Sequence, residues 1–299
     1  MIPVIYGLSS TSILPSEEQF FKKVKPAGFI IFSRNIESKD QLTQLCSQLK
    51  ELIEQDEKLI LIDQEGGRVQ RYKKQSSDGP TLYKPAKYFA DLEQKIGLDS
   101  ALIQTYKQNY KIAKEIKDLG FTTNCTPVAD LYYPDSDDIV GDRSFGADPL
   151  KVAKFCKQVV KAHNDVGIDS IIKHIPGHGR AKCDSHKKLP LIEATLEDLE
   201  NTDFIPFNLL KNCKFGMVAH IIYTSLDPIY PASLSKKVIE YIRFKIGFKG
   251  KLFTDCIHMS ALDSYNFSLK TKMALDAGCD YVIHSSGNIE EMKQVANIF

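Results

Sequence analysis

The chain has 299 residues, of which 43% are hydrophobic and 26% charged, and its formal net charge is +1 at pH 7. The composition is typical of a globular enzyme, and so small a net charge provides no general electrostatic basis for binding nucleic acid or an anionic membrane. No apolar run approaches the roughly 20 residues of a membrane span. No basic residue precedes the first apolar run, and the seven cysteines are scattered without a C-x-x-C pair. We therefore expect a cytoplasmic protein with reduced thiols and no membrane partner.

Short apolar runs alternate with amphipathic segments along the whole chain. The runs predicted to form strands are 4–6, 28–32, 59–62, 121–126, 170–172, 215–219, 251–254 and 281–283. The segments predicted to form helices are 39–54, 97–119, 149–166, 196–211, 235–246 and 269–277. Eight strands alternating with helices predict a single-domain α/β (β/α)8 barrel over residues 1–299, a fold of about 250 residues. An open, doubly wound sheet is the structural alternative.

Two long polar segments interrupt this alternation. Residues 70–87 contain proline and glycine and are predicted to form a surface loop. Residues 127–146 form a second long loop rich in acids, most of which we expect to be solvated. These acids are Asp130, Asp135, Asp137, Asp138 and Asp142. Arg143 lies between two glycine-containing turns and is a better candidate than these acids for pointing inward.

Polar residues follow most of the predicted strands directly. Examples are Asp63, the pair Lys173 and His174, His220, Asp255 and His284. In a parallel barrel these strand ends lie on one face, where active sites are built. The residues after 172 enter a loop, because Pro176, Gly177 and Gly179 disfavour both helix and strand.

Asp255 is the first candidate for chemistry. It lies at the end of a predicted strand, where nearby cations such as Lys173 and His174 would keep a carboxylate ionised as a nucleophile or base. The alternative is that Asp255 only caps the following helix.

Asp184 and His186 are the second candidate. Residues two apart on an extended segment project to the same side, so the carboxylate can bind one imidazole nitrogen and leave the other to exchange a proton. An Asx turn in a mobile loop explains the same spacing equally well.

Two further clusters are candidates for binding sites. His174, His178 and His186 resemble a set of metal ligands, but Pro176 breaks any helix and no H-E-x-x-H is present, so we expect neither a metal nor a cofactor. The segment from Asp63 to Arg71 contains paired glycines without a phosphate-loop motif. An acid followed by arginines suits the recognition of hydroxyl groups.

Five motifs together resemble glycoside hydrolase family 3, and most closely its single-domain bacterial β-N-acetylhexosaminidases of peptidoglycan recycling. They are Asp-Gln-Glu-Gly-Gly-Arg-Val-Gln-Arg at 63–71, Gly-Asp-Arg-Ser-Phe at 141–145, Lys-His-Ile-Pro-Gly-His-Gly at 173–179, Asp-Ser-His at 184–186 and Phe-Thr-Asp at 253–255. The resemblance extends over residues 3–283, and the third and fourth motifs at this separation are highly specific.

The resemblance implies a role for each matching residue. Asp255 would be the nucleophile, and His186 the acid/base acting with Asp184. The residues implied to bind the hydroxyls of N-acetylglucosamine are Asp63, Arg71, Arg143, Lys173 and His174. Related β-glucosidases take their acid/base from a second domain, for which this chain has no room, so a histidine on the barrel's own loop would serve.

The implied activity is that of a retaining exo-β-N-acetylglucosaminidase whose substrates are N-acetylglucosaminyl-1,6-anhydro-muramyl compounds from peptidoglycan.

The chain departs from the family after the nucleophile position, where Cys256 and His258 replace the usual Asp and Ser. Two alternatives therefore stay open. One is a phosphorylase, because a neutral acid/base repels phosphate less than a carboxylate does, and the other is a non-catalytic sugar-binding barrel.

Overall fold

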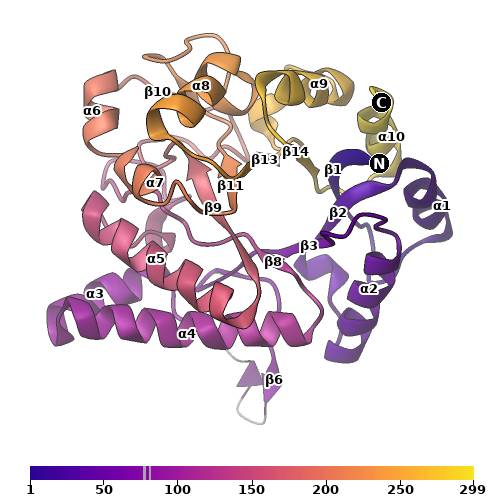
Figure 1. The fold of residues 1–299 in the computed structure, drawn as a ribbon, viewed down its shortest axis with the longest axis horizontal. Coiled ribbons are helices and arrows are strands. Elements are labelled where there is room, and N and C mark those ends of the chain that lie inside the picture. The colour runs from indigo at the N-terminus through magenta and orange to yellow at the C-terminus, as the bar shows by residue number, and fades with distance from the viewer. Residues whose placement is uncertain (77–78, 81) are drawn as a thin grey trace.

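The structure is a computed structural model that describes residues 1–76, 79–80 and 82–299. Within them, eight parallel strands close into a barrel in the order β1-β14-β13-β11-β9-β8-β3-β2, with helices around it (Figure 1). The strands are β1 (Ile2–Gly7), β2 (Pro26–Ile31), β3 (Leu59–Ile62), β8 (Thr123–Asn124), β9 (Asp169–Ile175), β11 (Phe215–Val218), β13 (Lys251–Cys256) and β14 (Tyr281–His284). The predicted (β/α)8 barrel is therefore confirmed, and each predicted strand overlaps one of these.

Side chains alternate between the inside and the outside of the barrel, as the strand period of two requires. Inward-facing residues such as Leu61, Ile171 and Phe253 form a central hydrophobic cluster. Their neighbours in sequence, such as Ile62 and Ile172, face outward and pack in two further clusters beneath the helices. The barrel is thus a packed core whose strand ends carry the polar groups on one face.

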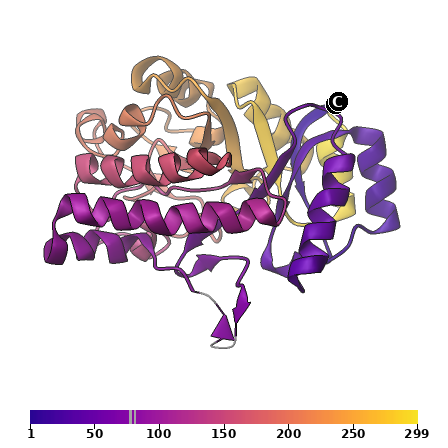
Figure 2. The same cartoon turned by 60° about the horizontal axis from the view of Figure 1, so that its bottom comes forward.

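The helices cover the outside of the barrel. They are α1 (Pro15–Val24), α2 (Lys39–Glu51), α3 (Ala86–Ile96), α4 (Leu98–Asp118), α5 (Pro149–Val166), α6 (Leu196–Asn201), α7 (Ile205–Leu209), α8 (Lys236–Tyr241), α9 (Phe267–Ala277) and α10 (Ile289–Ala296). In Figure 2, α3, α4 and α5 lie side by side as one layer. None of the helices in the described residues is long and apolar enough to cross a membrane.

Two predicted helices differ from the structure. The segment 196–211 is divided into α6 and α7, and Pro206 lies in the first turn of α7, where a missing N–H costs no hydrogen bond. The segment 235–246 begins as α8 but continues as a π-helix over Ile242–Ile246. Helices α1, α3 and α10 are not among the predicted elements, and they have only 10, 11 and 8 residues.

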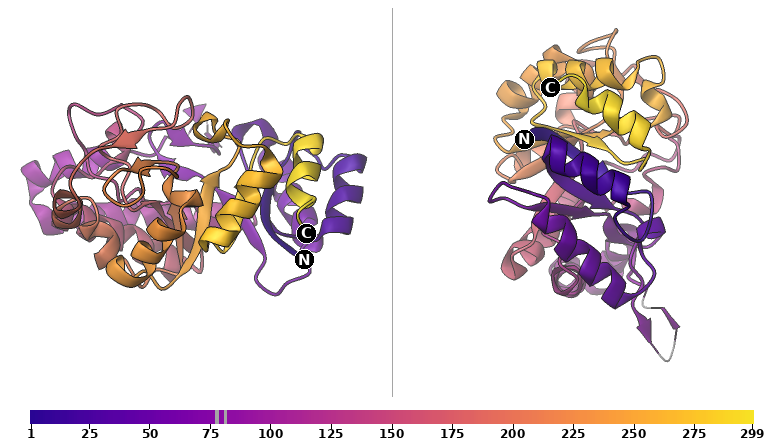
Figure 3. Two further views of the ribbon diagram at one scale, coloured as in Figure 1. Left: turned by 90° about the horizontal axis from the view of Figure 1, so that it is seen from above. Right: turned by 90° about the vertical axis from the view of Figure 1, so that its right-hand side faces the viewer.

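Short strands and the termini complete the fold. Two-stranded sheets join β4 (Gln64–Gly66) with β5 (Val69–Gln70), β6 (Gln75–Ser76) with β7 (Gly79–Pro80), and β10 (Leu191–Ile192) with β12 (Ile222–Tyr223). The predicted loop 70–87 contains β6 and β7, which project from the body (Figure 2), and residues 77, 78 and 81, which lie outside the described residues. Because β1 pairs with β14, the N- and C-terminal segments lie close together (Figure 3).

Candidate active site

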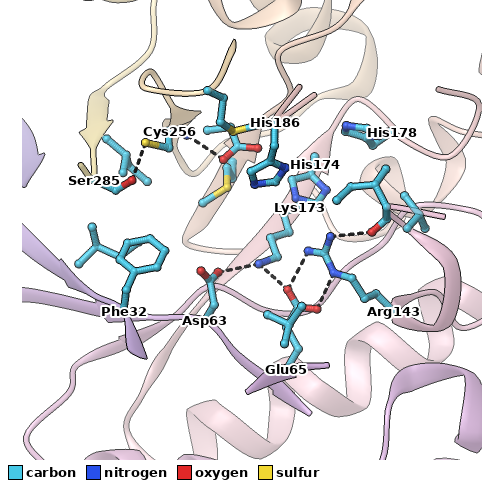
Figure 4. Close-up of a pocket in the computed structure, with 18 of the residues that line it drawn as sticks. Phe32, Asp63, Glu65, Arg143, Lys173, His174, His178, His186, Cys256 and Ser285 are labelled. Carbon is cyan, nitrogen blue, oxygen red and sulfur yellow. Dashed lines mark hydrogen bonds and ion pairs between the residues drawn. The ribbon is translucent and has the colours of Figure 1, made fainter. Parts of the chain in front are cut away.

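A cavity of about 390 Å³ opens at the carboxyl ends of the barrel strands (Figure 4). It is lined by polar side chains from four strand ends and by an apolar wall that includes Phe32, Val69 and Met259. Among the predicted site residues, those that line it are Asp63, Arg71, Arg143, Lys173, His174, His186 and Asp255. Asp184 lies behind His186 and does not line the cavity. The structure therefore brings together residues that are up to 192 positions apart, from Asp63 to Asp255.

Irregular pairing at two strand ends aims neighbouring residues into this cavity. Against β11, Lys173 pairs with Met217 and Ile175 with Val218, so His174 is an extra residue in β9. Against β14, the span from Phe253 to Cys256 is one residue longer than the strand opposite it. A bulge of one residue interrupts the alternation of side chains. As a result Lys173 and His174 both line the cavity, as do Asp255 and Cys256.

A buried network of charges forms one side of the cavity (Figure 4). Lys173 Nζ lies 2.8 Å from Asp63 Oδ1 and 2.6 Å from Glu65 Oε1. Arg143 binds Glu65 through two N–H groups at 2.8 and 2.9 Å. Arg71 Nη2 donates to Asp63 Oδ2 at 3.1 Å. Every buried carboxylate of the network therefore faces two cations, which is what makes its burial tolerable.

The network fixes the protonation states of its members. Burial alone would raise the pKa of Glu65, but Arg143 and Lys173 outweigh it and lower that pKa to about 2. The pKa of Asp63 falls below its usual range, as Lys173 and Arg71 overcome the same cost of burial. Burial opposes the charge of Lys173 too, yet Asp63 and Glu65 raise its pKa. All three groups are consequently charged at neutral pH.

Asp130 holds the histidines next to this network. Its side chain is fully buried, and Oδ2 lies 2.6 Å from Nδ1 of His174 while Oδ1 accepts the backbone N–H of His178 at 2.7 Å. Asp130 is therefore an exception in a loop where most acids are predicted to be solvated. An acid-rich stretch indicates a surface loop, but it does not reveal which acid meets an imidazole from a distant strand.

Asp255 lies in the cavity on β13, beside imidazoles from three other segments. Burial raises the pKa of its carboxyl, but His174, His220 and His186 together lower it below the ordinary value. Its Oδ1 accepts the backbone N–H of Cys256 at 2.7 Å. Asp255 is thus an ionised carboxylate with one oxygen held in place, the state required of a carboxylate nucleophile.

Asp184 and His186 combine the two arrangements that the sequence left open. Asp184 Oδ1 lies 2.9 Å from His186 Nδ1 and also accepts the backbone N–H of His186 at 2.8 Å. The second bond is an Asx turn, and it sets the imidazole where the same oxygen can bind its ring. The His186 side chain is 59% exposed at the mouth of the cavity. An imidazole in this position can exchange a proton through its other nitrogen.

Several polar side chains near the cavity are already bound to other protein groups. The three histidines considered as metal ligands contact different groups, since His178 Nε2 lies 3.0 Å from Ser185 Oγ while His174 and His186 face carboxylates. Arg180, in the loop before Asp184, donates to Asp203 at 2.7 Å. Glu65 lies within the motif at 63–71 but is not among the predicted site residues, because only the fold reveals its two cationic partners.

Comparisons with known proteins identify the family. Residues 7–299 match the model of the glycosyl hydrolase family 3 N-terminal domain. Curated proteins named beta-hexosaminidase from Nitrosomonas eutropha and Hydrogenovibrio crunogenus are 32% and 34% identical, over 94% of this chain and 80% and 77% of theirs. The structure of NagZ from Neisseria gonorrhoeae in complex with N-trifluoroacetyl-D-glucosamine superimposes with a TM-score of 0.89 at 28% identity, over 99% of this chain and 85% of that one.

A longer enzyme contains the same barrel. The family 3 β-N-acetylglucosaminidase from Paenibacillus sp. str. FPU-7 has a TM-score of 0.89 and 27% identity, and the match covers 99% of this chain but only 56% of that one. The barrel and the relatives define a glycoside hydrolase of the β-N-acetylhexosaminidase type. The chain belongs to glycosyl hydrolase family 3, because the family match extends over nearly all of it.

Proposed function

We propose that this protein is a retaining exo-β-N-acetylglucosaminidase that forms a covalent glycosyl-enzyme. The observation that carries the proposal is that Asp255 and His186 line the same cavity, Asp255 from the end of β13 and His186 from the cavity mouth, where its side chain is 59% exposed. A retaining glycosidase needs a carboxylate on one side of the anomeric carbon and a proton donor beside the leaving oxygen. Asp255 and His186 supply these two groups.

The reaction takes place in two steps. In the first, an Asp255 oxygen attacks the anomeric carbon while His186 transfers its proton to the departing glycosidic oxygen, which leaves as an alcohol. In the second, neutral His186 removes a proton from water, whose oxygen displaces Asp255 and releases the sugar. Asp184 accepts the Nδ1–H of His186 at 2.9 Å, which leaves Nε2 to carry the transferred proton.

We assign the hydroxyl contacts of the terminal sugar to Asp63, Arg71, Lys173, His174 and Arg143. The carboxylate of Asp63 keeps lone pairs beyond those bound by Lys173 and Arg71, and can accept from a hydroxyl. Arg143 uses three of its five N–H groups on Glu65 and the Ile139 carbonyl, so two remain to donate. None of these contacts requires a cofactor.

The substrates that we propose are N-acetylglucosaminyl-1,6-anhydro-muramyl compounds of cytoplasmic peptidoglycan recycling. A cavity of about 390 Å³ lies at the small end of ligand sites and suits one terminal pyranose. The relative from Neisseria gonorrhoeae binds an N-acylated glucosamine, which supports an N-acetyl sugar in this position. The remainder of such a substrate would extend past His186 into solvent.

The proposal predicts a specific pattern of products. The purified protein should hydrolyse p-nitrophenyl N-acetyl-β-glucosaminide, should cleave the matching β-glucoside much more slowly, and should release the β-anomer first. Nuclear magnetic resonance of the fresh product distinguishes the anomers. An α-anomer would contradict the covalent mechanism, a sugar 1-phosphate formed in phosphate buffer would indicate a phosphorylase, and binding without turnover would indicate a non-catalytic barrel.

Replacing His186 should slow proton transfer selectively. For His186→Ala we expect kcat to fall by about 10²- to 10⁴-fold with an alkyl leaving group, the usual contribution of general acid catalysis. The loss should be smaller with a nitrophenyl leaving group, which needs less protonation. Lys187→Ala changes the adjacent exposed side chain of the same loop and should keep wild-type kinetics. Equal losses for both leaving groups would reject His186 as the acid.

A further inference from the structure

Two histidines and a glutamate converge on the outer side of the barrel, apart from the cavity. His284 ends β14, Glu291 is in the first turn of α10, and His258 lies in the loop after β13. Because Ile283 faces into the barrel, His284 faces out of it and contacts Tyr6, whose ring centroid is 6.0 Å away. In the described part of the chain, this is the one group of three potential ligands that lie close enough to share a cation.

We propose that His258, His284 and Glu291 form a binding site for a divalent transition-metal cation, with Zn²⁺ as the best match. Two imidazole nitrogens and one carboxylate oxygen are a ligand set that zinc accepts with a fourth position left open. This site is independent of the proposed hydrolysis, since none of its members lines the sugar cavity.

The distances fit a tetrahedral centre. Glu291 Oε2 lies 3.3 Å from His258 Nδ1 and 3.1 Å from His284 Nε2, and all three ligand atoms lie within 4.8 Å of one another. Ligand atoms that are each about 2.0–2.1 Å from a tetrahedral zinc are about 3.3 Å from one another. Two of the three distances between ligand atoms therefore already have the required length. A small rotation of the exposed His258 ring would adjust the third distance.

The surroundings hold the ligands in this orientation. The Phe267 ring lies parallel to His258 at 6.1 Å and edge-on to His284 at 5.1 Å between centroids. Ser286 Oγ donates to Glu291 Oε2 at 2.6 Å and lies 3.4 Å from His284 Nε2, so the hydroxyl borders the open position. The packing holds His284 and Glu291 in place before any cation arrives, which lowers the ordering cost of binding.

The site is connected to the strand ends that carry Asp255. His284 is followed by Ser285, whose hydroxyl lies 2.7 Å from Cys256 Sγ, and the backbone N–H of Ile257 donates to the Ile283 carbonyl at 2.9 Å. A cation bound by both His258 and His284 would therefore cross-link the loop after β13 to the end of β14. We expect it to stabilise this part of the barrel rather than to take part in bond cleavage.

Cobalt and zinc titrations of the metal-free protein test the site. The wild type should bind one equivalent of Co²⁺ with the intense visible bands of a tetrahedral complex, and Zn²⁺ should displace it. Since a single outer-shell change already costs 10- to 100-fold in affinity, loss of a ligand in His258→Ala or Glu291→Gln should weaken binding by about 100-fold or more. His186→Ala removes the exposed imidazole of the cavity instead and should leave binding unchanged.

The outcomes separate this site from the sugar cavity. Wild-type protein that binds neither ion, or His258→Ala and Glu291→Gln variants that bind as tightly as the wild type, would overturn the proposal. Loss of binding in His186→Ala would place the cation in the cavity and would overturn it as well. Zn²⁺ should also raise the melting temperature of the wild type and not that of His258→Ala, a readout that does not depend on enzyme activity.

Discussion

Replacing Asp255 by alanine is expected to abolish hydrolysis of N-acetyl-β-glucosaminides, with kcat reduced by about 10⁴-fold or more. The carboxylate supplies both the bond to the anomeric carbon and the negative charge that faces the developing oxocarbenium ion. His174, His220 and His186 keep the pKa of this carboxyl below its ordinary value, so it is ionised and available to attack. Steady-state kinetics with an aryl substrate measure the loss.

Two further measurements distinguish a lost nucleophile from a damaged fold. Alanine leaves space beside the anomeric carbon, so added azide should restore turnover of Asp255→Ala and give the α-glycosyl azide. Cys256→Ser is the matched control, because a hydroxyl can keep the 2.7 Å contact with Ser285. This variant should stay close to the wild-type rate. Substantial activity of Asp255→Ala without azide would exclude Asp255 as the nucleophile.

Lys173→Met is expected to destabilise the fold by about 3–5 kcal/mol at pH 7, the usual cost of removing one partner from a buried ion pair. Methionine keeps the length of the apolar stem but removes the ammonium that Asp63 and Glu65 share at 2.8 and 2.6 Å. Arg71 and Arg143 still pair with these carboxylates, so we expect the lower part of this range. The free energy of unfolding in urea measures the change.

The effect of Lys173→Met should decrease in acid. Without the ammonium, the folded-state pKa values of Asp63 and Glu65 rise, so the folded variant binds protons more readily than the folded wild type. The wild type, whose two carboxyl pKa values are lowered, loses stability as the pH falls below the unfolded values near 4. The difference between the two proteins should therefore be largest at neutral pH.

Lys214→Met provides a control with the same local arrangement at the surface. Lys214 also bridges two carboxylates, Glu57 at 2.7 Å and Asp169 at 2.6 Å, but its side chain is 51% exposed. Exposed ion pairs contribute about 0–1 kcal/mol because water solvates the partner left behind. Equal destabilisation by both substitutions would mean that burial does not increase the cost of removing the Lys173 ammonium from its two carboxylates.

The barrel could be predicted because its strands are short apolar runs that end in polar residues. In β3 the run Leu59–Ile62 is apolar throughout and Asp63 follows at once, so both the strand and its functional end are visible locally. The end of β9 is not, since Lys173 and His174 are predicted to follow the strand and yet lie inside it. Two adjacent polar residues contradict strand alternation unless the partner strand reveals a bulge.

The site was only partly predictable for a similar reason. Asp184 and His186 are two residues apart, so a local argument finds their hydrogen bond. Asp130 and His174 are 44 positions apart, and only the folded barrel brings them within 2.6 Å. The sequence did not single out Asp130 among the acids of its loop, because local composition cannot identify a distant partner.

The extra residues in β9 and β13 also make these strand ends sensitive to chain length. In β9 the extra residue is His174, which lies between Lys173 and Ile175. Deleting it would restore regular alternation and remove one of the two side chains that line the cavity. Loops elsewhere on a barrel tolerate insertions and deletions without such an effect. Sequence alignments that place a gap here, and designs that graft these loops onto another barrel, must therefore preserve the residue count as strictly as the residue identities.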